Sequence, residues 1–161
     1  MIRLTQGDLF RSKAQTLVNA VNCVGVMGKG LAKEFRDRWP GMFREYAAAC
    51  RRGEVRSGKP FLYRERASQI LCFPTKDHWK DPSRYELIEE GLRAIRDHYR
   101  EWEIRSLALP ALGCGLGGLE WEKVRVLMEK HLKDLQIDIE VYAPSDADLM
   151  VDRPKNRLSL P

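Results

Sequence analysis

Two glycine-rich segments constrain the fold of this chain more strongly than any other feature of its sequence. The first, Gly25–Gly30, follows the β-branched run Thr16–Asn22 and precedes a helix that starts near Leu31. The second, Gly113–Gly118, follows the buried run Arg105–Pro110 and precedes another helix. Glycine lets successive backbone N–H groups converge on an anion, and a helix N-terminus adds partial positive charge. Because such loops lie at the carboxyl ends of strands in α/β sheets, two of them together are suited to hold a diphosphate.

Other glycine loops of known chemistry fit these segments poorly. The simplest alternative is that the glycines only make tight strand-to-helix turns. A single glycine-rich loop would favour this alternative, whereas two such loops favour a binding role. No Gly-Lys-Ser/Thr is present, so a Walker A loop and a nucleoside triphosphatase are disfavoured. Gly25, Gly28 and Gly30 have the wrong spacing for a dinucleotide fingerprint, and no acidic residue ends a second strand about 20 residues later.

The rest of the chain alternates strand patterns with helix patterns. Strands are expected at 2–5, 16–22, 59–65, 69–74, 105–110 and 137–142, and helices at about 31–39, 42–50, 83–102 and 121–132. Asp81 or Ser83 is expected to cap the third helix. This alternation predicts a three-layer α/β/α fold with a mixed, mostly parallel central sheet. We expect one domain over residues 1–145 and a polar tail or linker over 146–161.

Composition excludes several classes of protein. A length of 161 residues, 43% of them hydrophobic, suits one globular domain, and no apolar run is long enough to span a bilayer. Arg3 and Gln6 come too early for a signal peptide, so a cytoplasmic protein is expected. The four cysteines form no CxxC pair, and Cys72 and Cys114 are expected as buried thiols. The three histidines are isolated, so no metal is expected.

Four short blocks of the sequence resemble the macrodomain family. These blocks are Gly7–Leu9, Val18–Asn22, Val26–Ala32 and Leu109–Gly115. Two more, Phe73–Trp79 and Gly118–Trp121, resemble the DarG group of DNA ADP-ribosyl glycohydrolases, whose relatives include the terminal ADP-ribose protein glycohydrolases. The resemblance implies a domain that binds ADP-ribose and needs no cofactor or metal.

The resemblance also implies which residues hold ADP-ribose. The implied ligand-binding residues are Asp8, Leu9, Asn22, Gly28, Lys29, Gly30, Thr75, Gly113, Cys114, Gly115, Leu116, Gly117 and Tyr142. Asp8 would accept the adenine amino group and Leu9 would offer its backbone N–H. Tyr142, with Pro144, would flank the adenine, and the Asn22 amide would bond the distal ribose. The glycine loops would supply N–H groups to the phosphates.

Several of these side chains have a purely structural alternative. Asp8 can cap a turn, and Asn22 can stabilise its loop. Lys29 can face the solvent, and Tyr142 can be an ordinary core residue. Asn19, three residues before Asn22, is expected to satisfy local backbone groups.

Lys76 is the implied catalytic residue. It follows the apolar strand that ends at Pro74, and a lysine partly desolvated there can act as a base or a nucleophile. In the resembled hydrolases this lysine attacks the anomeric carbon C1″ or activates the group that does. Without the resemblance, Lys76 would be interpreted as a surface lysine, and Lys80 is its rival by position. His78 and Trp79 can help to hold a base by stacking, although Trp79 can equally be packing.

One departure from the family pattern bears on the substrate. The terminal ADP-ribose enzymes carry an aspartate in the second glycine loop, whereas this chain has Leu116-Gly117-Gly118. The absence of this aspartate favours the DNA-directed branch of the family over enzymes that hydrolyse protein esters.

The sequence therefore predicts an enzyme that cleaves the N-glycosidic bond between ADP-ribose and a DNA base, with thymidine in single-stranded DNA as the expected target. The alternatives are a reader that binds ADP-ribose without cleaving it and a protein mono-ADP-ribosyl hydrolase. The resemblance implies a DarT-type toxin as a partner, bound through a region beyond this domain. A net charge of +5, with Arg51, Arg52, Arg56 and Lys59 close together, fits a nucleic-acid strand.

Overall fold

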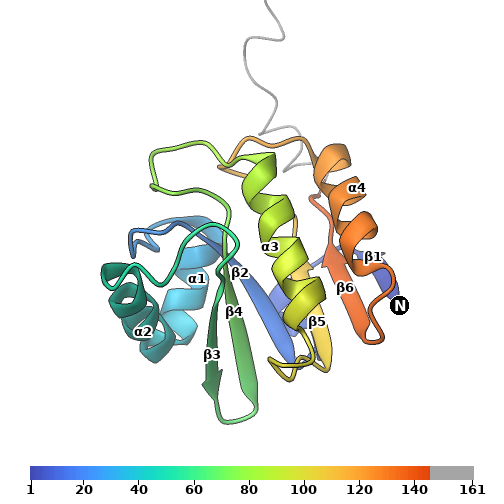
Figure 1. Cartoon of the computed structure of the whole chain (residues 1–161), viewed down its shortest axis with the longest axis horizontal. Coiled ribbons are helices and arrows are strands. Elements are labelled where there is room, and N and C mark those ends of the chain that lie inside the picture. The colour runs from blue at the N-terminus through green and yellow to red at the C-terminus, as the bar shows by residue number, and fades with distance from the viewer. Residues whose placement is uncertain (146–161) are drawn as a thin grey trace, which may run out of the picture.

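A six-stranded sheet runs through residues 1–145, the part of the chain that the computed structural model describes (Figure 1). The strands are β1 (Ile2–Thr5), β2 (Thr16–Val21), β3 (Phe61–Glu65), β4 (Ser68–Pro74), β5 (Ser106–Pro110) and β6 (Asp138–Tyr142). The helices are the 3-10 turn η1 (Leu9–Arg11), α1 (Gly30–Arg38), α2 (Pro40–Arg51), α3 (Tyr85–His98) and α4 (Trp121–Leu132). The expected tail at 146–161 lies outside the described residues.

The strand order is β1-β6-β5-β2-β4-β3, and every neighbouring pair is parallel except the β3–β4 hairpin. The predicted mixed, mostly parallel sheet is therefore confirmed. Because the five parallel strands point the same way, their carboxyl ends meet at one edge, where ligands bind in α/β folds.

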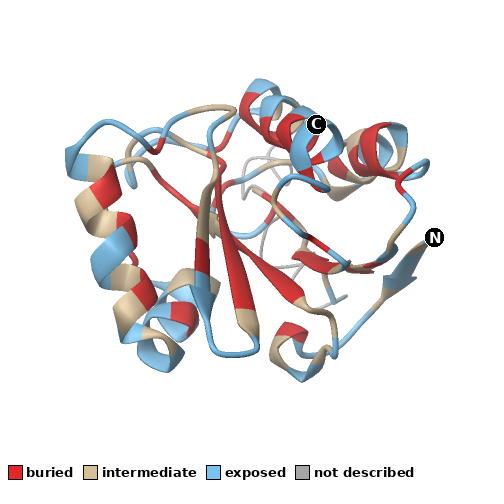
Figure 2. Cartoon of the chain, turned by 60° about the horizontal axis from the view of Figure 1, so that its bottom comes forward, coloured by how far each residue is buried: buried red, intermediate tan, exposed pale blue. Residues whose placement is uncertain are grey.

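Side-chain alternation along the strands divides the core into two layers. On β2, Val18 packs with the residues of α3 and α4, whereas Leu17 and Val21 pack with those of α1 and α2. The helices thus cover both faces of the sheet, as the three-layer prediction required. Figure 2 shows the central strands mostly buried, while the helices carry buried and exposed stripes. Gly91 on α3 leaves room for the Phe73 ring of β4, which a methyl group there would overlap.

The structure differs from the predicted elements mainly at helix ends. Helix α2 was expected to start at about residue 42, but it begins at Pro40, whose missing N–H costs nothing in the first turn of a helix. Helix α3 begins at Tyr85 and its capping residue is Arg84, which makes no side-chain cap. The prediction that Asp81 or Ser83 caps this helix is therefore wrong. Ser83 is buried and its backbone N–H donates to the Gly117 carbonyl at 3.1 Å, so a tertiary contact uses it instead.

All four cysteines are free, and Cys72 and Cys114 are buried, as predicted. Among the described residues, no helix has the length and apolar content that a membrane span requires.

Candidate functional site

The two glycine loops lie side by side at the carboxyl edge of the sheet. They follow β2 and β5, which are neighbours in the sheet. A Cβ atom built on Gly30 would lie 3.9 Å from Leu116 Cδ1, so the start of α1 touches the tip of the second loop. Leu116 is 77% exposed there, an unusual position for a leucine in a soluble domain. The structure thus brings together the two loops that the sequence singled out.

Asn22 builds the first loop. Its side chain is buried, and its Oδ1 accepts hydrogen bonds from the backbone N–H groups of Val24 (3.1 Å) and Val26 (3.3 Å). Its Nδ2 donates to the Val26 carbonyl at 2.7 Å. These bonds support the loop-stabilising alternative for Asn22, and one Nδ2 hydrogen remains for a ligand. The predicted contact with the distal ribose stays a prediction.

A tyrosine from α2 holds Asn22 in place. The Tyr46 hydroxyl is fully buried and lies 2.6 Å from the Asn22 carbonyl and 2.9 Å from its Oδ1. Burial raises the pKa of Tyr46, so the hydroxyl stays protonated and donates. Helical spacing places Tyr46 on the apolar stripe of its helix and does not predict this role, because periodicity cannot reveal a buried polar partner.

We expect Tyr46→Phe to loosen the first loop. Losing this donor leaves the Asn22 backbone carbonyl without its partner, whereas Oδ1 keeps the Val24 and Val26 N–H groups. A buried acceptor left unsatisfied typically costs about 1–3 kcal/mol of unfolding free energy. Urea unfolding would measure this loss, and calorimetry should show weaker ADP-ribose binding. Tyr63→Phe is the matched control, since its hydroxyl bonds to Glu65 at 3.1 Å and lies beside Gly41 at the start of α2, away from the loops. Equal stability of the two variants would contradict a role for Tyr46 in the loop.

The backbone amides of the second loop are left free. Within residues 1–145, the N–H groups of Gly115, Leu116 and Gly117 donate to no protein acceptor, although the loop is closed by Leu119 N–H to the Gly113 carbonyl at 3.0 Å. Gly113 has a φ of +74°, which favours glycine. Three successive unpaired N–H groups in a turn are typical of an anion-binding concavity. The loop is therefore well suited to a phosphate.

The first loop offers a second set of donors. The N–H groups of Met27, Gly28 and Lys29 have no acceptor in the described chain, and α1 begins at Gly30 directly behind them. The helix N-terminus adds partial positive charge at this point. The Lys29 side chain is exposed with no ion pair among the described residues, consistent with its solvent-facing alternative. Both loops thus carry N–H groups without a protein acceptor, and their predicted contact with the pyrophosphate stays a prediction.

Lys76 lies beside the first loop. Cys23 ties the two segments together, because its N–H donates to the Asp77 carbonyl at 2.8 Å and its thiol lies 3.6 Å from the Lys76 carbonyl. Lys76 is half-buried, and its amine forms no ion pair within the described chain. Asp77, the carboxylate next to it in sequence, pairs with Arg84 at 3.0 Å instead. An amine without a carboxylate partner is free to act on a ligand.

Two other candidates for chemistry near Lys76 are less suitable. Burial, followed by the Asp77 carboxylate, raises the pKa of Cys23 to about 11, so its thiol is neutral and a poor nucleophile. The Lys80 amine lies 5.1 Å from the centroid of the Trp79 ring, where a cation–π contact holds it. Trp79 also stacks on His78 with a centroid distance of 5.3 Å and is 49% exposed, and its predicted contact with a base stays a prediction.

Thr75, by contrast, is buried. Its hydroxyl accepts from the Ser83 hydroxyl at 3.3 Å, and its N–H donates to the Val21 carbonyl at 2.9 Å. Its side chain therefore orients the strand end that carries Lys76, and its predicted ligand contact stays a prediction.

The predicted adenine-binding residues gather at the far end of the same edge. Thr5 of β1 pairs with Tyr142 of β6, so the turn that holds Asp8 lies near the end of β6. Asp8 caps η1 through a bond from Phe10 N–H at 2.9 Å, which bears out its structural alternative and leaves Oδ2 unpaired. The Leu9 N–H has no acceptor in the described chain. Burial, and then Glu140, raise the pKa of Tyr142, whose side chain is half-buried.

One expectation about a strand residue at the site fails. Asn19 does not satisfy local backbone groups: its Nδ2 lies 3.7 Å from Met27 Sδ, and its buried Oδ1 has no partner in the described chain. A strand side chain stands perpendicular to the sheet, which directs Asn19 into the core instead of back to its own backbone. Within residues 1–145, no group of His, Cys, Asp or Glu residues could hold a metal ion.

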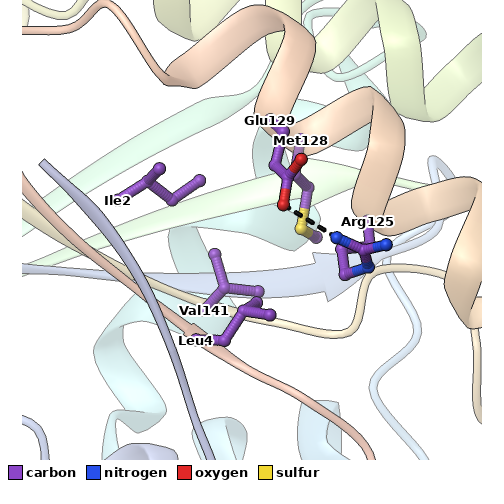
Figure 3. Close-up of a pocket in the computed structure, with 6 residues that line it drawn as sticks. All are labelled: Ile2, Leu4, Arg125, Met128, Glu129 and Val141. Carbon is purple, nitrogen blue, oxygen red and sulfur yellow. Dashed lines mark hydrogen bonds and ion pairs between the residues drawn. The ribbon is translucent and has the colours of Figure 1, made fainter.

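A small cavity elsewhere in the fold contains none of these residues. It lies between β1, β6 and α4, has a volume of about 30 Å³, and is lined in part by the Arg125–Glu129 ion pair at 2.9 Å (Figure 3). This space is close to that of one water molecule, too small for a nucleotide.

A three-layer α/β/α domain with two opposed, donor-rich loops at one sheet edge defines a class of phosphate-binding domain. The Macro domain family matches residues 18–128, and the chain belongs to this macrodomain family. It is 45% identical to the macrodomain of Mycobacterium tuberculosis DarG, with a TM-score of 0.87 over 90% of this chain and 99% of that one. The resemblance to DarG macrodomains is therefore confirmed.

Two further relatives extend this comparison. A DNA ADP-ribosyl glycohydrolase of Thermus aquaticus is 40% identical over 100% of this chain and 44% of its own length. Thermosipho africanus DarTG, solved in complex with ADP-ribose, is 42% identical with a TM-score of 0.86 and covers 93% of this chain and 44% of its own. The chain spans less than half the length of the curated relatives it matches.

Proposed function

We propose that this chain is an ADP-ribosyl glycohydrolase that removes ADP-ribose from a DNA base, with thymidine in single-stranded DNA as its target. The observation that carries the proposal is the pairing of two sets of unpaired N–H groups with an unpaired lysine amine, tied to the first loop through Cys23. The relatives that are named DNA ADP-ribosyl glycohydrolase, at 40% and 43% identity, support the same activity.

In this proposal the domain acts by positioning. The N–H groups of Gly115, Leu116 and Gly117 hold one side of the pyrophosphate, and those of Met27, Gly28 and Lys29 hold the other. Asp8 and Leu9 receive the adenine at the far end of the edge. With both ends fixed, the distal ribose extends along Asn22 toward Lys76, and its C1″ carries the modified base.

Lys76 has two possible roles in the bond cleavage. As a nucleophile, its amine bonds to C1″ while the C1″–N bond to the base breaks and its electron pair leaves with the base. Water then displaces the lysine and the base gains a proton. As a general base, Lys76 takes a proton from the water that attacks C1″ directly. Either route passes through an oxocarbenium-like transition state, and neither requires a cofactor or a metal.

A DarT-type transferase is the proposed source of the modification and the proposed partner. The Thermosipho africanus relative is named as a fusion of a DNA ADP-ribosyl transferase with a DNA ADP-ribosyl glycohydrolase, which supports this pairing. A direct contact with the transferase would use a region beyond residues 1–145.

The test compares two substrates, and the binding of free ADP-ribose, with one protein. The wild-type chain is incubated under single-turnover conditions with a thymidine-ADP-ribosylated oligonucleotide and, separately, with a protein carrying ADP-ribose on a carboxylate ester; free ADP-ribose binding is measured by calorimetry. We expect release from the oligonucleotide and little from the ester. Binding without release from either substrate would indicate a reader, and release from the ester alone would indicate a protein hydrolase.

A further inference from the structure

The positive charge of this chain is concentrated in one segment. Residues 29–59 contain nine Lys and Arg residues against four Asp and Glu residues, a balance of +5, which equals the formal net charge of the whole chain. The remaining residues are therefore balanced. This segment comprises α1, α2 and the approach to β3, and it begins at the end of the first glycine loop.

Basic side chains on α3 and α4 form ion pairs, whereas several of those in residues 29–59 do not. On α3 and α4, Arg93 and Lys130 both pair with Glu89, and Arg125 pairs with two glutamates. In the basic segment, the exposed side chains of Arg51, Arg56 and Lys59 form no ion pair with any described residue. Arg52 differs from its neighbours because both its Nε and its Nη2 bind Glu54 at 2.9 Å. Three cations in this segment thus remain free for an external anion.

Two of these cations are held by a fixed turn. Arg56 and Lys59 are bridge partners, and Lys59 N–H donates to the Arg56 carbonyl at 2.8 Å, so their side chains leave the turn together. The turn is anchored on α3: the Ser57 hydroxyl bonds to the Glu90 carboxylate, and a Cβ on Gly58 would lie 3.6 Å from Glu90 Cβ. This anchoring distinguishes the pair from flexible surface cations.

The turn lies at the same sheet edge as Lys76. Phe61 of β3 pairs with Cys72 of β4, and Lys59 comes two residues before Phe61, so the turn lies near the carboxyl end of β4. Lys76 follows two residues later. The Lys59 turn therefore flanks Lys76 on the β3 side, opposite the second glycine loop on the β5 side.

Arg51 is connected to the site through the contact between α2 and the first glycine loop. It follows Cys50 at the end of α2, and the last turns of that helix contact the first glycine loop, since a Cβ on Gly25 would lie 3.4 Å from Ala47 Cα. Cys23 of this loop in turn contacts the Lys76 carbonyl. Arg51 thus follows a helix that contacts the first glycine loop, and that loop contacts the segment of Lys76.

We infer that Arg51, Arg56 and Lys59 form a phosphate track for the single DNA strand that carries the ADP-ribosylated base. This inference rests on the proposed function and adds the path of the substrate: phosphates next to the modified nucleotide lie over the Arg56–Lys59 turn and the end of α2. The track recognises backbone charge and reads no sequence, because exposed Arg and Lys side chains contact phosphates without distinguishing bases. It makes a modified strand a better substrate than a modified nucleoside.

The test uses two substrates and two matched double variants of the full chain. The track variant is Arg56→Gln/Lys59→Gln. The control variant, Arg105→Gln/Lys133→Gln, removes the same charge from exposed positions before β5 and after α4, at the opposite edge of the sheet. Release of ADP-ribose is measured from a thymidine-ADP-ribosylated oligonucleotide and from an ADP-ribosylated thymidine nucleoside, across a series of salt concentrations.

We expect the track variant to lose about tenfold in kcat/KM on the oligonucleotide and to match the wild type on the nucleoside. The slope of log kcat/KM against log salt should fall by about 1.4, since each phosphate contact to a single strand contributes about 0.7. Equal losses on both substrates, equal losses in both variants, or no loss in the track variant would each overturn the track. No release by the wild type from either substrate would instead overturn the proposed function.

Discussion

Lys76→Ala is expected to reduce single-turnover release of ADP-ribose from a modified oligonucleotide by about 100- to 10,000-fold, the usual contribution of a positioned base or nucleophile. Binding of free ADP-ribose should change little, because the N–H groups of the two loops, and not this amine, hold the phosphates. The comparison therefore separates a lysine that acts in the chemical step from one that binds the ligand.

Two further variants make this result specific. Lys76→Arg keeps the positive charge, but arginine stays protonated and cannot serve as a nucleophile or a base. We expect it to be as slow as Lys76→Ala; full activity in Lys76→Arg would show that only the charge matters. Lys80→Ala is the position-matched control and should retain wild-type release, since the Lys80 amine rests on Trp79. A strong loss in Lys80→Ala alone would move the catalytic role there.

The nucleophile route forms a covalent intermediate between Lys76 and ADP-ribose, and the general-base route does not. If Lys76 bonds to C1″, denaturing the reaction during a single turnover and digesting the protein should yield a Lys76 peptide heavier by one ADP-ribose. General-base action leaves that peptide unmodified. Since both routes predict the same loss in Lys76→Ala, the mass of this peptide distinguishes them.

The sequence predicted the parts of this fold that local patterns encode. Alternating and continuous apolar runs gave all six strands, and glycine spacing gave the two loops at their carboxyl ends. The position of both loops at one edge also followed, because parallel strands share their carboxyl edge. That β2 and β5 are neighbours depends on the strand order, which the sequence did not predict. Helix α4 agrees with its predicted bounds at both ends.

What the sequence missed depends on contacts between distant residues. Ser83 has the side chain of a helix cap, yet it bonds to Thr75 and Gly117 because the end of β4 and the second loop converge on it. Tyr46 has the spacing of a core residue, yet its hydroxyl organises Asn22. In both cases one local pattern permits two roles, and only the tertiary partner decides between them. The three unpaired amides of the second loop likewise depend on how the loop closes.

Gly117→Ala is the second variant with a large expected effect, because it changes how the second glycine loop closes. A Cβ at this buried position would lie 2.8 Å from Ser83 Cβ and 2.5 Å from the Gly113 carbonyl oxygen, so the loop must move. Moving it disperses the N–H groups of residues 115–117. A hydrogen bond to a charged group contributes about 1.5–3 kcal/mol, so losing one weakens ADP-ribose binding by roughly 10- to 100-fold.

The control for this variant lies two residues earlier in the same loop. A Cβ on Gly115 would have nothing within 4 Å in the free protein, so Gly115→Ala should unfold in urea like the wild type. Gly117→Ala should lose about 1–3 kcal/mol of unfolding free energy through overpacking. If Gly117→Ala instead kept both its stability and its affinity for ADP-ribose, the second loop would tolerate another closure. The amides of residues 115–117 would then not be the phosphate site, and the pyrophosphate would have to rest on the first loop alone.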